Sequence, residues 1–170
     1  QFGFKIKYNT AVKSLADLEK LEKSNDAIFI GIGLGPTSGI DIPGESLTNC
    51  VGAVEFVEQL RMKHHKISVG RQVVVLGGGN TAMDAASESA RMGADKVLLA
   101  YRRSKEEMKG YDFEYNLAKS VGVVGMFNVT PLKILGKRKV EGVRFVKNKS
   151  AYGKIRAVKG KNISGFEFLV

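Results

Sequence analysis

The middle of the chain carries two continuous apolar runs separated by a helical pattern. Residues 73–76 are four apolar residues in succession, which is typical of a strand buried on both faces. Residues 80–92 place small alanines at helical spacing, and Gly93 follows where helices often stop. Residues 96–101 form the second apolar run. This order predicts a strand–helix–strand unit with parallel strands.

The segment before this unit predicts shorter elements. Residues 4–8 alternate apolar and basic side chains, as a half-buried strand does, and Ser14 precedes a short helical pattern that it can cap. Residues 26–30 predict a short strand that runs into the glycine cluster of residues 31–35. Because Pro36 and a loop-rich stretch follow, rather than a helix, we interpret this cluster as a tight crossover and not as a phosphate loop.

Two further amphipathic helices are predicted, one on each side of the central unit. The first begins at Asn49 or Cys50 and has an apolar face at helical spacing, made of Ala53, Phe56, Val57 and Leu60. The second covers residues 112–119 and ends near Gly122, with Phe113 and Leu117 facing inward and Tyr115 as a further candidate.

The last third of the chain predicts strands. Residues 123–127 continue the parallel sheet, and residues 129–135 form a broken edge element because Pro131 cannot donate to a ladder. Residues 139–146 predict another strand, and residues 164–170 begin one that stops while still apolar, as expected of a piece cut from a longer chain. The predicted class is α/β: a Rossmann-like three-layer domain with a parallel central sheet and an additional small β meander.

The junction between the first apolar run and its helix carries a dinucleotide-binding fingerprint. Gly77, Gly79 and Ala82 have the spacing Gly-x-Gly-x-x-Ala. Gly77 permits a sharp turn, Gly79 lets a pyrophosphate approach the backbone, and Ala82 lets the helix pack close to the strand. The first N–H groups of the helix then face the phosphates. We therefore expect a dinucleotide here; the alternative is a glycine-rich turn of an unrelated α/β protein.

The residues after the second strand indicate which of the two nicotinamide dinucleotides, NAD(H) or NADP(H), the site would bind. NAD-preferring sites usually carry Asp or Glu there, to accept a hydrogen bond from the ribose 2′-hydroxyl. This chain instead has Arg102 and Arg103, followed by Lys105. Because a guanidinium pairs with phosphate oxygens in two places, these residues suit a 2′-phosphate. We predict NADP(H), with NAD(H) as the alternative cofactor and a solvated loop edge as the alternative role of the arginines.

Composition narrows the function classes. The chain has 170 residues, 44% of them hydrophobic and 26% charged, as expected of a packed domain, and no run long enough to span a membrane. The net charge of +10 is mostly spread along the chain without an RNA-binding signature, which favours an anionic cofactor over nucleic acid. Cys50 stands alone, and His64 and His65 are adjacent. We therefore expect no metal site, no catalytic residue in this chain, and a cytoplasmic location.

These motifs resemble the NAD(P)H-binding domain of a family of FAD-dependent pyridine-nucleotide oxidoreductases. The family includes the small subunit of glutamate synthase and the flavin subunit of dihydropyrimidine dehydrogenase. The resemblance covers most of the chain, and the matching segments are residues 27–35, 42–45, 73–84, 101–103, 106–108 and Glu114 with the helix around it. The order of fingerprint, Tyr-Arg-Arg and Glu-Glu-Met makes it specific. The chain departs from the family at Lys109, where Pro often follows Met.

The resemblance implies an enzyme. The whole protein would pass hydride from NADPH to FAD, and electrons on to an iron–sulfur or substrate-reducing partner such as a large catalytic subunit. Residues 1–40 would be a crossover segment on the FAD-domain side, with Gly33 near the cofactor, and residues 41–170 the NAD(P)H-binding domain. The family's FAD fingerprint and cluster cysteines are absent from this sequence. FAD would therefore be held elsewhere in the parent chain, and this piece alone would be inactive.

The resemblance also implies roles for single residues. The pyrophosphate would contact Gly77, Gly78 and Gly79 and the backbone N–H groups of Asn80 and Thr81. The adenosine 2′-phosphate would be held by Arg102 and Arg103, with added charge from Lys105. Neither nucleic acid nor a membrane is an expected partner. The alternative function is a non-catalytic dinucleotide-binding sensor or regulatory module that uses the same fingerprint.

Overall fold

The structure is a computed structural model that describes residues 3–33, 35–63, 67–151 and 154–162. Its internal contacts divide the chain into two units, Gln1–Gly35 and Pro36–Val170. The predicted assignment of residues 1–40 and 41–170 to different parts of a larger protein stays a prediction. His64, His65 and the segment 164–170 lie outside the described residues.

The first unit contains one helix, α1 (Leu15–Ser24), among its described residues. Ser14 caps it as predicted, since its Oγ accepts a hydrogen bond from the Asp17 N–H at 3.2 Å. The two strands predicted in this unit are wrong: residues 4–8 and 26–30 form no strand. Phe4 is 74% exposed and Phe29 94% exposed. A strand needs a neighbour to pair its backbone groups, and the described part of this unit offers none.

The second unit is built on a parallel sheet. Its strands β1 (Gln72–Leu76), β2 (Lys96–Tyr101) and β3 (Val123–Phe127) lie in the order β1-β2-β3. Helix α3 (Asn80–Arg91) connects β1 to β2, and α4 (Asp112–Ser120) connects β2 to β3. Gly93 follows α3 with a φ of +93°, as a helix-ending glycine does. The predicted strand–helix–strand unit is therefore confirmed.

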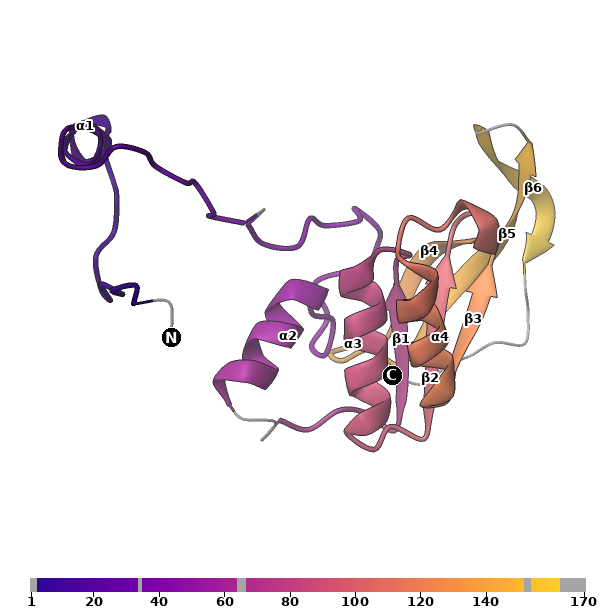
Figure 1. Cartoon of the computed structure of the whole chain (residues 1–170). Coiled ribbons are helices and arrows are strands. Elements are labelled where there is room, and N and C mark those ends of the chain that lie inside the picture. The colour runs from indigo at the N-terminus through magenta and orange to yellow at the C-terminus, as the bar shows by residue number, and fades with distance from the viewer. Residues whose placement is uncertain (1–2, 34, 64–66, 152–153, 163–170) are drawn as a thin grey trace. The chain divides into compact units, whose positions relative to one another are not determined.

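The parallel sheet is covered on both faces (Figure 1). On one face α2 (Ala53–Met62), α3 and α4 pack against side chains such as Val75 and Leu99. On the other face lies an antiparallel sheet of β4 (Val129–Leu135), β5 (Gly142–Ala151) and β6 (Lys154–Asn162). Its residues Val129 and Phe145 share a core with Ala100 of β2. The three-layer fold class is confirmed, with the meander itself as the third layer.

Helix α2 begins later than predicted, at Ala53 rather than near Asn49. Asn49 has a φ of +73°, which is incompatible with a helical turn. A distant residue supplies the cap instead: Thr37 Oγ1 accepts from the Val54 N–H at 3.0 Å, and the Thr37 N–H donates to Glu55 Oε1 at 2.9 Å. This reciprocal pair of hydrogen bonds pairs a free N–H group in the first turn of α2, as a capping box does. The capping residue, however, lies far away in the sequence.

Helix α4 buries Tyr115, the further candidate named from the sequence, but not Phe113 and Leu117. Phe113 is 64% exposed and Leu117 is also exposed, whereas Tyr115 is 5% exposed and Ala118 is buried. Tyr115 packs edge-on against Phe127 of β3, with ring centroids 5.8 Å apart. Both stripes satisfy helical spacing, so contact with α3 and β3 decides between them.

The strands of the meander differ from the prediction mainly in their bounds. β4 is an edge strand and contains Pro131 beside a register shift, as predicted. β5 begins at Gly142 rather than at Lys139, which instead forms an isolated bridge with Thr48. β6 was not predicted, because its sequence is dominated by basic and small residues and only its first four positions alternate polar and apolar side chains. In the described residues, no helix has the length and apolar character to cross a membrane.

Candidate functional site

The loop that follows β1 makes the close contacts that the fingerprint predicts. Gly77 has a φ of +151° and donates its N–H to the Ala100 carbonyl at 3.0 Å. A Cβ atom on Gly77 would lie 2.9 Å from the Cβ of Ala82. Both positions therefore require small residues, because the first turn of α3 packs directly on the end of β1.

Gly78 and Gly79 lie in opposite surroundings. A Cβ atom on Gly78 would approach the Tyr101 ring to 2.5 Å, so Gly78 is a packing glycine. A Cβ atom on Gly79 would meet no heavy atom within 4 Å. Gly79 is exposed and is the N-cap residue of α3. The open space that a ligand could enter thus lies over Gly79, at the start of the helix.

Helix α3 presents free backbone donors at this opening. The N–H groups of Ala82 and Met83 both donate to the Gly79 carbonyl, at 3.1 and 3.2 Å. For Asn80 and Thr81, the described part of the chain supplies no acceptor for the backbone N–H. Unpaired donors and the positive end of the helix dipole together favour an anion.

The Asn80 side chain supports the loop and is not free to bind a ligand through its oxygen. Its Oδ1 accepts from the Tyr111 N–H at 2.9 Å, and the neighbouring Gly110 N–H donates to the Gly78 carbonyl at 3.0 Å. The chain after β2 therefore crosses back to hold the fingerprint loop in place. The backbone N–H of Asn80 remains available, and its role in binding a pyrophosphate stays a prediction.

The arginines lie at the same edge of the sheet as the fingerprint, because the carboxyl ends of parallel strands meet there. Arg102 is exposed and Arg103 is half-buried. Within the described residues, neither guanidinium forms an ion pair or hydrogen bond. Lys105 opens a short 3-10 helix, η1 (Lys105–Glu107), and its Nζ lies 5.7 Å from the centre of the Tyr115 ring. The guanidiniums are thus available to an anionic ligand.

The predicted binding residues that belong to the unit Pro36–Val170 all lie at one edge of the parallel sheet. The residues predicted to bind the pyrophosphate follow β1, and the basic residues predicted to bind the 2′-phosphate follow β2 of the same parallel sheet. Gly33 belongs to the unit Gln1–Gly35, and its proximity to a cofactor stays a prediction. Among the described residues, no cluster of three metal-binding side chains occurs.

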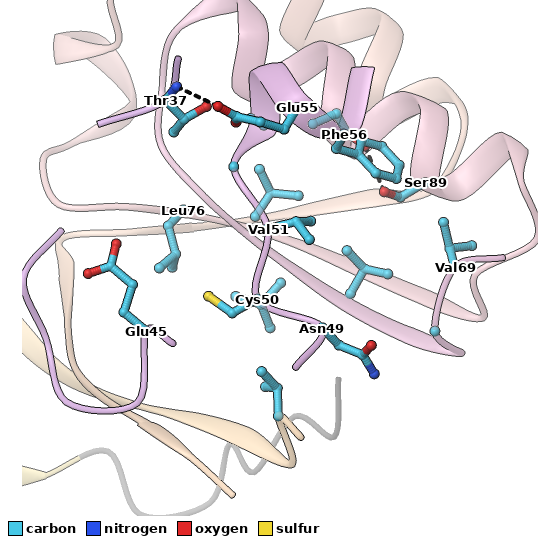
Figure 2. Close-up of a pocket in the computed structure, with 18 of the residues that line it drawn as sticks. Thr37, Glu45, Asn49, Cys50, Val51, Glu55, Phe56, Val69, Leu76 and Ser89 are labelled. Carbon is cyan, nitrogen blue, oxygen red and sulfur yellow. Dashed lines mark hydrogen bonds between the residues drawn. The ribbon is translucent and has the colours of Figure 1, made fainter. Parts of the chain in front are cut away.

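A cavity lies elsewhere, along the edge of β1 (Figure 2). It has a volume of about 790 Å³ and is lined by apolar side chains of β1, α2 and the meander, together with Glu45, Cys50 and Glu55. Glu45 accepts hydrogen bonds from the N–H groups of Ile40 and Asp41, and Glu55 is bonded to Thr37. Burial, and to a lesser degree the charge of Glu45, raise the pKa of the Cys50 thiol.

This cavity does not have the features of a dinucleotide or catalytic site. Its two carboxylates are already bonded to the backbone of the chain, and a thiol with a raised pKa is a poor nucleophile. None of the residues predicted to bind a cofactor lines it. This cavity and the candidate site are therefore separate places in this unit.

Sequence reasoning missed two asparagines that contact the basic loop, which we define as residues 102–105 after β2. Asn128 donates its N–H to the Arg103 carbonyl at 2.9 Å, and Asn148 Nδ2 donates to the Arg102 carbonyl at 2.9 Å. Asn128, between two strand patterns, could have been recognised as a turn residue. Asn148 gives no local signal, because its partner lies 46 positions away.

Comparison with known proteins identifies similar sequences over most of the chain. The family model described as pyridine nucleotide-disulphide oxidoreductase matches residues 3–155. The small chain of glutamate synthase [NADPH] from Escherichia coli is 35% identical over 99% of this chain. The beta subunit of NADP(+)-dependent formate dehydrogenase from Moorella thermoacetica is 33% identical over 86% of it. A subunit of NAD-dependent dihydropyrimidine dehydrogenase from Escherichia coli is 29% identical over 81%.

The chain spans only 38%, 21% and 33% of the length of these three relatives. Among solved structures, FprA from Mycobacterium tuberculosis has a TM-score of 0.63 at 20% identity, over 85% of this chain and 49% of that one. FprA in complex with NADPH has a TM-score of 0.61 at 18% identity, over 85% of this chain and 48% of that one. At these identities the likeness concerns the fold alone.

Proposed function

The chain belongs to the pyridine nucleotide-disulphide oxidoreductase family, and on this premise we propose that it is the NADPH-binding part of an FAD-dependent oxidoreductase. The observation that carries the proposal is the opening over Gly79. There, the unpaired N–H groups of Asn80 and Thr81 lie at the sheet edge that also carries Arg102 and Arg103. A pyrophosphate and a 2′-phosphate are the two anionic groups of NADPH, and these are the two anion-binding groups of the site.

The residues present suit NADPH, and their work is to bind and orient it. Gly79 provides the space for the pyrophosphate, the amides of α3 provide hydrogen bonds, and the arginines provide charge. When bound, NADPH supplies the hydride chemistry, which needs no acid or base from this chain. The described residues do not provide a comparable place for FAD. The other glycine cluster, residues 31–35, is not followed by a helix whose amides could face phosphates.

The choice of NADPH over NADH rests on Arg102 and Arg103. The glutamate synthase and formate dehydrogenase relatives carry NADPH or NADP(+) in their names, whereas the dihydropyrimidine dehydrogenase relative is named for NAD. The family therefore accommodates both cofactors. Two unpaired guanidiniums at the end of β2 favour the phosphorylated one.

The whole protein's reaction belongs to this proposal as well. We expect hydride to pass from NADPH to FAD held by another part of the parent chain, and electrons to pass to an iron–sulfur or substrate-reducing partner such as a large subunit. Three relatives are named as subunits or chains of larger enzymes, which supports such a partner. The cytoplasmic location expected from the sequence is part of the same proposal. Family membership supports an enzyme over the non-catalytic sensor.

Paired arginine variants test the site. Changing Arg102 and Arg103 to Ala removes the predicted phosphate partners, and each charge-assisted bond is worth roughly 1.5–3 kcal/mol. We therefore expect NADPH to bind roughly tenfold or more weaker for each arginine removed, with NADH little affected. The matched control is Arg61→Ala, in the last turn of α2. Titration calorimetry with both cofactors gives the affinities; equal losses for NADPH and NADH would contradict the assignment.

A further inference from the structure

A single residue, Asn128, connects the parallel sheet to the meander. It lies between the end of β3 and the start of β4 and has a φ of +58°, a left-handed conformation that Asn adopts more readily than most residues. Its N–H donates to the Arg103 carbonyl at 2.9 Å, and its own carbonyl accepts from the Asn148 N–H at 2.6 Å. The sharp turn at Asn128 therefore joins the basic loop to β5.

Asn148 extends this connection to the neighbouring arginine. It is 5% exposed and lies at a register shift in the pairing of β5 with β6. Its Nδ2 donates to the Arg102 carbonyl at 2.9 Å and to Thr130 Oγ1 at 2.7 Å. Its buried Oδ1 has no hydrogen-bond partner in the described part of the chain. Burying an amide is costly unless it is bonded, so the two bonds of Nδ2 are what offset the burial of this side chain.

We propose that Asn148, together with Asn128, is a positioning residue that fixes the Arg102–Arg103 backbone for recognition of the 2′-phosphate, so that the meander sets the cofactor preference of the parallel-sheet domain. This inference rests on the proposed NADPH site.

The geometry gives the two asparagines this role because they bond two consecutive carbonyls. With the carbonyls of Arg102 and Arg103 both held, the directions in which the two side chains leave the backbone are fixed. An arginine on a fixed backbone loses less conformational freedom when it pairs with a phosphate than one on a mobile loop. Other bonds hold neighbouring parts of the same segment: the Ser104 N–H donates to Glu107 Oε2 at 3.1 Å, and the Gly110 N–H donates to the Gly78 carbonyl at 3.0 Å. The bonds to the carbonyls of Arg102 and Arg103 themselves come from Asn148 and Asn128.

The test compares Asn148→Ala, which removes both bonds of Asn148 Nδ2, with Thr130→Val, which removes only the bond to Thr130. Asn148→Ala removes the donor to the Arg102 carbonyl, and Thr130→Val removes the other acceptor while leaving that donor in place. Both are measured in the full chain by titration with NADPH and with NADH. For Asn148→Ala we expect NADPH to bind roughly three- to tenfold weaker, as the cost of ordering one further side chain. NADH should change less than twofold. Thr130→Val should leave the ratio of the two affinities unchanged.

A double variant separates this inference from the proposed function. If Asn148 acts through Arg102, then Asn148→Ala adds no further loss of NADPH affinity in an Arg102→Ala background. If Arg102→Ala itself leaves the ratio of NADPH to NADH affinity unchanged, the proposed phosphate site is refuted. Two results would refute the positioning role and leave the phosphate site standing. In the first, Arg102→Ala lowers the ratio of NADPH to NADH affinity but Asn148→Ala does not. In the second, Asn148→Ala lowers this ratio by the same factor with Arg102 present and with Arg102 replaced by Ala.

A second substitution keeps the proposal testable if Asn148→Ala does not fold. Asn148→Asp preserves the shape. Its carboxylate can accept from the Thr130 hydroxyl, reversing the present bond in which Nδ2 donates to Thr130 Oγ1, but a carboxylate cannot donate to the Arg102 carbonyl. We expect it to lower the ratio of NADPH to NADH affinity as well. A folded Asn148→Asp variant with the original ratio would overturn the positioning role.

Discussion

Gly78 and Gly79 are neighbours in the fingerprint, yet the structure predicts opposite effects when each is changed to Ala. A methyl group on Gly79 enters open space at the start of α3, whereas one on Gly78 enters the ring of Tyr101. Gly79→Ala should therefore weaken ligand binding and leave the folding stability nearly unchanged. Gly78→Ala should lower the folding stability. The pair separates a glycine needed for binding from one needed for packing.

For Gly79→Ala the expected change in folding stability is close to zero. Its φ of −98° is accessible to Ala, and restricting the unfolded chain stabilises by about 0.4–1 kcal/mol. Ala is a poorer N-cap than Gly, which offsets most of that gain. The added methyl occupies the space that the pyrophosphate must enter. We expect NADPH and NADH both to bind about tenfold weaker or worse, or about 1.4 kcal/mol, because the pyrophosphate is common to them.

For Gly78→Ala the added Cβ would lie 2.5 Å from a ring carbon of Tyr101, whereas two carbon atoms in contact lie about 3.5–4.0 Å apart. The ring or the loop must move by roughly 1 Å. Overpacking of this kind costs about 1–3 kcal/mol, which lowers the Tm by roughly 3–12 °C in a domain of this size. Thermal unfolding followed by circular dichroism measures this change, and titration calorimetry measures the binding of Gly79→Ala. A Gly79→Ala protein that binds both cofactors normally would refute the assignment of the opening.

Three further predictions concern the fold. Leu99 is fully buried in the central strand, so Leu99→Ala should destabilise by about 2–5 kcal/mol, seen as a lower urea midpoint. Thr37→Val removes the acceptor for the Val54 N–H and should cost about 1 kcal/mol in the same assay; no loss would show that the distant cap is unimportant. Because burial raises the pKa of Cys50, its alkylation by iodoacetamide should be slower than that of free cysteine at pH 8 and should rise only at higher pH. If the pH midpoint of the alkylation rate lay at or below that of free cysteine, the raised pKa would be contradicted.

The elements with local signals could be predicted from sequence alone. β2 has the predicted bounds, and α3 begins at the predicted residue, because an apolar run, a glycine turn and a helix-ending Gly93 each act within a few positions. Residues 26–30 show where such reasoning fails. Their apolar run is typical of a strand, but a strand also needs a partner, and Phe29 is 94% exposed.

Contacts between distant residues account for the other differences. Helix α2 begins where Thr37, 17 positions before Val54, caps it. In α4 it is Tyr115 that packs against Phe127 of β3, which leaves Phe113 and Leu117 exposed. At the site, residue type and spacing predicted the fingerprint and the arginines. They could not predict that Asn128 and Asn148 bond the carbonyls of Arg103 and Arg102, because these bonds join residues far apart in the sequence.

The central claim, that a dinucleotide binds over the first turn of α3, can be tested by amide-resolved hydrogen exchange with and without NADPH. Bound pyrophosphate should slow the exchange of the Asn80 and Thr81 amides, which have no acceptor in the described residues, and NADPH should also protect the loop after β2. Unchanged exchange at Asn80 and Thr81 under saturating NADPH, with protection confined to the cavity around Cys50, would contradict it.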